Sequence, residues 1–153
     1  MSKKEKIFRT TKEVLKTAKR RKSSSTRWLQ RQINDPYVRQ AQAEGKRSRA
    51  AYKIIQIDEK YKIFNEGSSV LDLGAAPGSW TEVAIERAGG FVLAVDILDM
   101  DNINRAVILK ADLQEEDSFG LINKLAVEKF DVVLSDMAAS TTGHKSTDHI
   151  RTQ

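Results

Sequence analysis

Four short apolar runs follow one another between residues 70 and 137 of the chain. They are Val70–Leu73, Phe91–Asp96, Val107–Asp112 and Phe130–Met137. Short runs that are apolar without strict alternation are typical of strands buried on both faces of a parallel sheet. Apolar residues at helical spacing occupy 79–88 and 115–129, between the first and second runs and between the third and fourth. The pattern therefore predicts an α/β fold with a largely parallel sheet and crossover helices.

The polar first half of the chain predicts three helices. Ser23–Thr26 is expected to form a hinge and to cap a short first helix. Asp35 is suited to cap a second helix that begins at Pro36 and ends at Gly45. A third helix is expected from Ser48 to Tyr61. Its predicted buried stripe is Ala50, Ile54, Ile57 and Tyr61.

The turn after the first run carries the first candidate chemistry. It reads Gly74-Ala75-Ala76-Pro77-Gly78, and the next helix starts at Ser79. Gly74 and Gly78 allow the backbone to approach a ligand closely. A dinucleotide-binding loop would instead have Gly-x-Gly-x-x-Gly, and Pro77 removes an amide that could hold a phosphate. The loop therefore favours S-adenosylmethionine over a dinucleotide, so a dehydrogenase is the weaker hypothesis. A tight turn without a ligand is a further alternative.

Acidic residues end the later strands. Asp96 lies 22 residues after Gly74, at the tip of the second run, where a carboxylate can accept hydrogen bonds from ribose hydroxyls. Asp112 ends the third run and is suitably placed for an adenine amino group, and Asp136 lies near the end of the fourth. Each acid taken singly is more often a turn residue. Because three of them follow a glycine loop, we predict that they line one ligand crevice.

Charge is distributed unevenly along the 153 residues. Residues 1–53 hold 17 Lys and Arg against 4 Asp and Glu, a net +13, and residues 54–153 hold 9 against 17, a net −8. The two values sum to the net +5 of the whole chain. Positive charge interleaved with Trp28 and Tyr37 is typical of a nucleic-acid surface. Residues 1–22 are expected to be a flexible basic arm, for which solvation and RNA binding are equally good explanations, and 23–153 a separate domain.

Several classes of protein are disfavoured by composition. The chain has no cysteine, so it forms no disulfide and no thiolate metal site. His144 and His149 lack a helical metal spacing, so no metal is expected. No apolar run approaches 18 residues and no signal-peptide pattern is present, so no membrane association is expected. A cytoplasmic location is expected, with a monomer if the sheet is complete.

The motifs together resemble one family. They are Ser25-Thr26-Arg27-Trp28-Leu29, Asp35-Pro36-Tyr37-Val38, Arg47-Ser48-Arg49-Ala50-Ala51-Tyr52-Lys53, Asp72-Leu73-Gly74-Ala75-Ala76-Pro77-Gly78-Ser79-Trp80 and Ser135-Asp136-Met137-Ala138. From about residue 23 onward this combination closely resembles the FtsJ/RrmJ family. Its members are Rossmann-like, S-adenosylmethionine-dependent methyltransferases that modify a uridine ribose 2′-hydroxyl in large-subunit ribosomal RNA. The resemblance implies that ribosomal RNA, or the large ribosomal subunit, is the partner.

The resemblance also implies roles for individual residues. The implied cofactor contacts are Gly78, Trp80, Asp96, Asp112 and Asp136, to which the loop itself adds Gly74. Helical spacing alone makes Lys53 a surface lysine. The family's Lys-Asp-Lys-Glu catalytic set instead aligns its first Lys with Lys53 and its Asp with Asp136.

The family's second Lys and its Glu would fall beyond residue 153, as would the last strands of its sheet. We therefore expect residues 1–153 to have little methyltransferase activity. The alternative to an active enzyme is a shortened remnant that binds cofactor or RNA without catalysis. Smaller departures from the family are Ser79, where the loop commonly has a second Gly, and Ala139-Ser140 in place of Pro-Asn.

Overall fold

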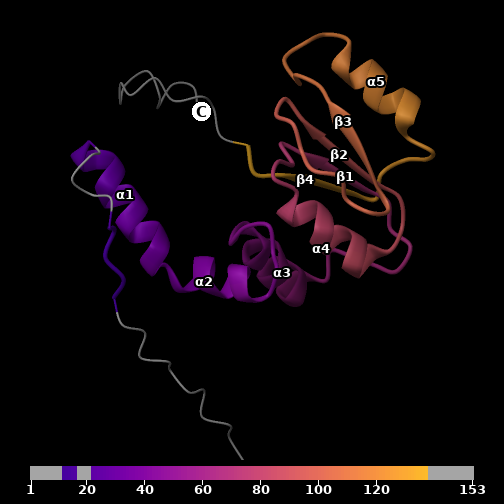
Figure 1. Cartoon of the computed structure of the whole chain (residues 1–153). Helices are drawn as coiled ribbons and strands as arrows, with labels where there is room; N and C mark the ends of the chain where they lie inside the picture. Colours follow the sequence, from indigo (N-terminus) through magenta and orange to yellow (C-terminus); the bar gives the residue numbers. More distant parts are fainter. Residues whose placement is uncertain (1–11, 17–21, 138–153) are drawn as a thin grey trace, which may run out of the picture. The chain divides into compact units, whose positions relative to one another are not determined.

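A computed structural model of the chain describes residues 12–16 and 22–137 (Figure 1). The chain divides into two compact units, Met1–Lys46 and Arg47–Gln153. The division between the units therefore falls after residue 46, whereas the sequence suggested one after residue 22. Most of the predicted arm lies outside the described residues. The predicted loop at 138–145 and the helix start near 147 lie outside them as well.

In its described residues, the first unit contains two helices separated by one residue, Asp35. They are α1, Ser23–Asn34, and α2, Pro36–Ala43. The predicted cap is confirmed, because the Asp35 side chain accepts hydrogen bonds from the Tyr37 and Val38 amides. The predicted hinge at Ser23–Thr26 is wrong, because these residues form the first turn of α1. The Thr26 amide and hydroxyl both donate to the Lys22 carbonyl, at 3.0 and 3.2 Å, and so close that turn.

The second unit is built on a four-stranded parallel sheet in the order β3-β2-β1-β4. Its strands are β1, Val70–Leu73; β2, Val92–Asp96; β3, Ala106–Lys110; and β4, Val132–Ser135. Leu71 is paired with Leu93 on one side and with Val133 on the other, so β1 is central. The predicted α/β class is confirmed. In the described part of the chain β4 is an edge strand, and it is shorter than the run Phe130–Met137 suggested.

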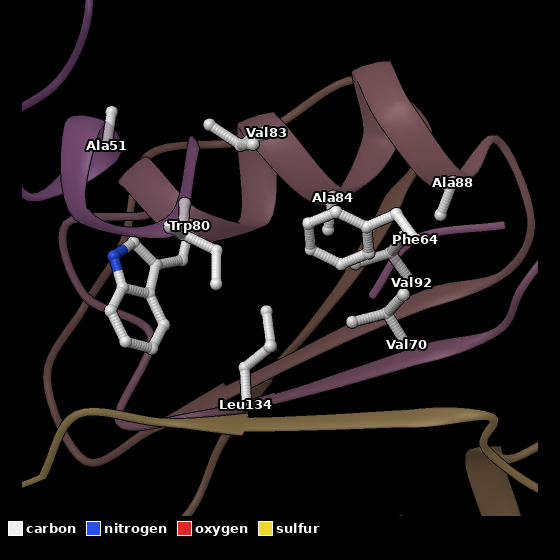
Figure 2. Packing of buried hydrophobic residues seen from close by; sticks show 10 residues of the cluster. Ala51, Phe64, Val70, Trp80, Val83, Ala84, Ala88, Val92 and Leu134 are labelled. Carbon is white, nitrogen blue, oxygen red and sulfur yellow. The ribbon is translucent and has the colours of Figure 1, made fainter. Parts of the chain in front are cut away.

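Helices cover both faces of this sheet, as Figure 1 shows. Helices α3, Ala50–Tyr61, and α4, Ser79–Ala88, lie on one face, and α5, Ser118–Leu125, lies on the other. On the first face Phe64 and Trp80 pack with Val70, Val92 and Leu134 (Figure 2). On the second face, Ile122 of α5 packs against Leu71, Leu93 and Val95. The alternation of strand side chains thus forms two cores and makes a three-layer unit.

The buried stripe of α3 differs from the predicted one. Ala51, Ile54 and Asp58 are buried, whereas Tyr61 is 64% exposed. The helix ends at Tyr61, Lys62 takes a left-handed conformation, and the last residues of the helix, 59–61, are exposed. Asp58 can be buried because its carboxylate accepts from the Phe64 amide at 3.0 Å and from Arg87 at 2.7 Å.

The crossover helix is also shorter than predicted. α5 covers eight residues instead of the whole of 115–129. Ile122 is buried, whereas Phe119 and Leu125, which belonged to the same predicted pattern, are exposed. One strip of so short a helix faces the sheet, so the remaining apolar side chains lie at its margins.

Candidate active site

The loop 74–78, which we call the cofactor loop, joins β1 to α4 at the carboxyl end of the sheet. The Gly74 and Ala75 amides donate to the Val95 carbonyl at 2.8 and 3.2 Å, which fixes the loop beside β2. Gly74 and Gly78 have φ angles of 72° and 103°. These left-handed conformations favour glycine. Side chains at these positions would meet Met137 and Ile103, respectively. The glycines are therefore required by the turn and by close packing on both sides of it.

Asp96 fastens the same loop from the end of β2. One carboxylate oxygen accepts from the Ala76 amide and the other from the Leu98 amide, each at 2.8 Å. The Ala111 amide donates to the Asp96 carbonyl at 2.9 Å, so Asp112 follows close to the tip of β2. The Asp112 carboxylate accepts from the Gln114 amide at 2.9 Å. The structure thus brings two of the predicted acids together at one edge of the sheet.

Two hollows lie at this edge and share Gly74. The larger, of about 730 Å³, is lined in part by Leu73, Gly74, Asp96, Asp112, Phe119 and Met137. The smaller, of about 120 Å³, is lined in part by Asp72, Gly74, Pro77, Trp80 and Asp136. The predicted residues Gly74, Trp80, Asp96, Asp112 and Asp136 therefore line one or the other of two hollows that meet at Gly74. Gly78 lines neither hollow and lies at the start of α4, against Ile103.

Lys53 and Asp136 form an ion pair beside the smaller hollow. Lys53 Nζ lies 2.5 Å from Asp136 Oδ1, and the two side chains are 56% and 51% exposed. The same Nζ lies 5.5 Å from the centroid of the Trp80 ring. The indole of Trp80 is itself fixed, since its Nε1 donates to the Ala50 carbonyl at 2.8 Å. Lys53 is thus directed toward the site by a carboxylate and an aromatic ring.

Asp72 was not predicted as a site residue, although it is the one polar residue of the first apolar run. Its side chain lines the smaller hollow and is 1% exposed. The Thr81 hydroxyl donates to it at 2.7 Å. The pKa of Asp72 is raised to about 6. Burial is the main cause, the hydrogen bond from Thr81 lowers the pKa, and the charge of Asp96 contributes to the rise. A buried carboxyl with a raised pKa in a hollow is typical of a functional site.

Arg47 is a second residue whose place the sequence did not indicate. As one of the basic residues among the first 53, Arg47 was assigned to the nucleic-acid surface. In the structure its guanidinium instead forms hydrogen bonds within the second unit. Its Nε donates to Glu82 Oε1 of α4 at 2.6 Å, and its Nη1 donates to the Pro77 carbonyl at 3.2 Å. Further bonds reach the carbonyls of Asp101 and Asn102 at 3.3 and 3.0 Å. Arg47 therefore clamps the cofactor loop, α4 and the segment after β2 together.

Comparison with known proteins identifies the family. The description "FtsJ-like methyltransferase" belongs to a family model that matches residues 46–153. The chain belongs to the FtsJ-like methyltransferase family. The match begins within one residue of the second unit and contains the cofactor loop, Lys53 and Asp136. The predicted family and the Rossmann-like fold are confirmed.

Curated relatives extend the similarity into the first unit. The chain is 51% identical over 139 residues to "Ribosomal RNA large subunit methyltransferase E" of Maricaulis maris, covering 91% of this chain and 50% of the relative. It is 53% identical over 144 residues to the protein of the same name in Paramagnetospirillum magneticum, covering 90% and 59%. The chain thus spans about half to three fifths of the length of these FtsJ-like relatives.

A solved structure supports the fold. The crystal structure described as a putative ribosomal RNA methyltransferase from Plasmodium falciparum aligns with a TM-score of 0.61 and 32% identity. The alignment covers 68% of this chain and 63% of that one. Among the described residues, no three His, Cys, Asp or Glu side chains gather as metal ligands. No helix in the described ranges has the length and apolar character needed to cross a membrane.

Proposed function

We propose that this chain binds S-adenosylmethionine at the shared hollows and serves transfer of its methyl group to a ribose 2′-hydroxyl of large-subunit ribosomal RNA. The observation that carries the proposal is the ion pair Lys53–Asp136 beside the hollow lined by Gly74, Trp80 and Asp72. The pair supports the proposal because a cation and a carboxylate lie next to a hollow at the carboxyl ends of parallel strands. Ligands of open α/β sheets bind at that edge.

The side chains around the hollows suit a ligand of this charge. S-adenosylmethionine carries a sulfonium and an ammonium cation, ribose hydroxyls and an adenine amino group. The hollows offer Asp72 and Asp136 on the smaller side and Asp96 and Asp112 on the larger. We assign Asp96 to the ribose and Asp112 to the adenine amino group. The amides of the cofactor loop, by contrast, are turned to Val95, Asp96 and Ala75, an arrangement that does not offer a phosphate cradle.

The reacting partner needs placement and removal of a proton. Bound S-adenosylmethionine supplies an activated methyl group, and a ribose hydroxyl is a weak nucleophile near neutral pH. Lys53 can donate hydrogen bonds to the ribose oxygens from a position fixed by Asp136 and Trp80. Asp136 can orient the hydroxyl or hold the ammonium of Lys53 in place. This pair is therefore assigned to positioning the nucleophile.

Calorimetric titration tests the cofactor half of the proposal. S-adenosylmethionine and its demethylated product should bind, and NAD should bind more weakly. Asp96→Ala should weaken binding by about 1–3 kcal/mol, the loss expected for a charged hydrogen bond. Asp117→Ala, an exposed acid at the start of α5, is the matched control. Tighter binding of NAD would reject the proposal.

Labelled methyl transfer tests the reaction half. Unmethylated large ribosomal subunits are the substrate, and the product nucleoside is analysed for a methyl group on its 2′-oxygen. Methylation of a base instead would contradict the assignment of Lys53 and Asp136. Residues 1–153 are expected to give counts near background, and binding of S-adenosylmethionine without any transfer would assign this chain to the alternative, a cofactor-binding remnant.

A further inference from the structure

We propose that one face of α1, formed by Ser24, Arg27, Trp28 and Arg31, binds single-stranded RNA. We call these four residues the basic face. In this proposal an unpaired base stacks on Trp28, and the two arginines contact the neighbouring phosphates. The choice of RNA rests on the proposed function, whereas the geometry of the surface does not depend on it.

Helical spacing gathers these residues on one side of α1. They stand at positions i, i+3, i+4 and i+7, which face the same way on an α-helix. Trp28 is 54% exposed, Ser24, Arg27 and Arg31 are exposed as well, and α1 has no buried residue. A hollow on the helix is lined by Ser24, Arg27, Gln30 and Arg31. The basic face therefore combines an accessible indole with two accessible guanidinium groups.

The neighbouring strip of α1 is already occupied by the chain itself. The side-chain amides of Gln30 and Asn34 bond to backbone groups of residues 13–15. Gln30 accepts from the Leu15 amide at 3.0 Å and donates to the Glu13 carbonyl. Asn34 accepts from the Glu13 amide at 2.9 Å and donates to its carbonyl at 3.0 Å. These hydrogen bonds satisfy the polar side chains beside the basic face. The guanidinium groups of Arg27 and Arg31 are then the charged groups of the face that can bind a partner.

The two arginines differ from other arginines of the chain. Arg39 donates to the Ile33 carbonyl at 2.9 Å and lies 3.8 Å from Glu13, and Arg47 is paired with Glu82. In the described part of the chain no carboxylate pairs with Arg27 or Arg31. Among the described residues, Arg27 makes one long hydrogen bond, 3.4 Å, from its Nε to the Ser23 carbonyl. Residues 22–34 contain no acid, so an anionic partner is the one this face complements.

The exposed indole favours a single strand over a duplex. An aromatic side chain can stack on a base only when the base is unpaired, and such stacking tolerates any sequence. Two arginines one helical turn apart then meet phosphates on either side of that base. A second copy of this chain is the competing occupant, and the experiment separates it from a single strand of RNA.

Binding is measured with a short labelled oligouridylate by fluorescence anisotropy over a range of salt concentrations. The double variant Arg27→Ala/Arg31→Ala should reduce the slope of log K against log salt by about 1.4, since each phosphate contact on a single strand contributes about 0.7. Trp28→Ala should weaken binding by about 5-fold to 150-fold with an unchanged slope, and Trp28→Phe should retain most of the affinity. Lys124→Ala/Lys129→Ala removes the same charge from exposed positions of the second unit and is the matched control.

Trp28 also reports directly on stacking. The chain has two tryptophans, and Trp80 is only 8% exposed, so quenching of fluorescence by oligouridylate should come mainly from Trp28. Equal loss of affinity in both double variants would overturn the proposal, as would equal binding of a blunt duplex. A dimer in sedimentation that dissociates in Trp28→Ala would overturn it too, because the face would then be an interface between copies.

Circular dichroism of each variant shows whether α1 still forms. If Trp28→Ala loses helical structure, the proposal is tested by comparing the oligouridylate binding of the wild type with that of Trp28→Phe and of Arg27→Ala/Arg31→Ala. Failure of this proposal is distinguishable from failure of the proposed function. Calorimetry with S-adenosylmethionine reports on the second unit alone, and these α1 variants should leave that titration unchanged.

Discussion

The Nε of Arg47 lies 2.6 Å from Oε1 of Glu82, across 35 residues of sequence. This bond ties the residue at the start of the second unit to the first turn of α4. The same guanidinium donates to the Pro77 carbonyl of the cofactor loop. Since the loop and α4 together shape the proposed ligand site, Arg47 is a positioning residue that acts through them.

Replacing Arg47 by Ala should therefore weaken S-adenosylmethionine binding and also lower the stability of the folded chain. Hydrogen bonds to charged groups contribute about 1.5–3 kcal/mol each, and the loss here is expected near the upper part of that range. Arg47→Lys should recover only part of it, because an ammonium cannot reproduce the planar fork. Calorimetry and thermal unfolding measure the two effects.

Arg105→Ala is the matched control for Arg47. Arg105 makes one long bond, 3.3 Å, to the Gly89 carbonyl at the far end of α4. It should change neither cofactor affinity nor stability by much. If Arg47→Ala lowered stability and left affinity unchanged, Arg47 would be a residue of the fold only.

The buried pair Asp58–Arg87 should contribute strongly to stability. Asp58 Oδ2 lies 2.7 Å from Arg87 Nη1, and its other oxygen accepts from the Phe64 amide. Asp58→Asn removes the charge that lies 2.7 Å from Arg87, leaves that arginine the longer contact with Glu59, and should cost roughly 1.5–3 kcal/mol of the free energy of unfolding. Chemical denaturation measures this. Glu59→Gln is the control, because Glu59 lies 3.7 Å from the same arginine and is mostly exposed.

The same pair predicts a pH dependence. Burial raises the pKa of Asp58, but the Phe64 amide and the Arg87 guanidinium outweigh it and hold the pKa below the ordinary 3.8. The folded state therefore binds fewer protons than the unfolded state as the pH falls past 3.8. The stabilisation from Asp58 is complete above that pH and is lost as the pH drops through the lowered pKa. Asp58→Asn should remove this acid-dependent loss of stability when the free energy of unfolding is measured as a function of pH.

Sequence patterns predicted the elements whose signals are local. The Asp35-Pro36 start of α2, the strand at Val70–Leu73 and the helix over 79–88 are each determined by neighbouring residues in the sequence. Tyr61 was assigned wrongly to the buried stripe because periodicity does not show which residues at the end of a helix are exposed. Arg47 and Asp72 were missed for a related reason. Their roles depend on partners such as Glu82 and Thr81, which the fold brings near and the order of residues does not reveal.

The exposed pair Lys53–Asp136 should behave in the opposite way to the buried one. Both side chains are about half exposed, and exposed ion pairs contribute about 0–1 kcal/mol. Lys53→Ala should therefore leave thermal unfolding nearly unchanged. S-adenosylmethionine affinity should also change little, because Lys53 is assigned to the ribose of the RNA. A large loss of stability would show that Lys53 supports the packing of Trp80 instead.

The buried carboxyl of Asp72 should cost stability near neutral pH and support ligand binding. Its pKa is about 6 in the folded chain, chiefly through burial, against 3.8 for the ordinary group. The folded state thus holds the proton more tightly, so the stability contributed by Asp72 is greatest below pH 3.8 and is lost as the pH rises through about 6. The difference is about 3 kcal/mol at most, from 1.36 kcal/mol for each pKa unit.

Asp72→Asn should accordingly raise the free energy of unfolding at pH 7.5 and change it little at pH 4, whereas the exposed control Asp117→Asn should show no such pH dependence. Because Asp72 lines the smaller hollow, the same variant should bind S-adenosylmethionine, which carries a sulfonium cation, more weakly. Denaturation at the two pH values and calorimetry at pH 7.5 measure both effects, and a variant that bound the cofactor as tightly as the wild type would show that Asp72 serves the fold alone.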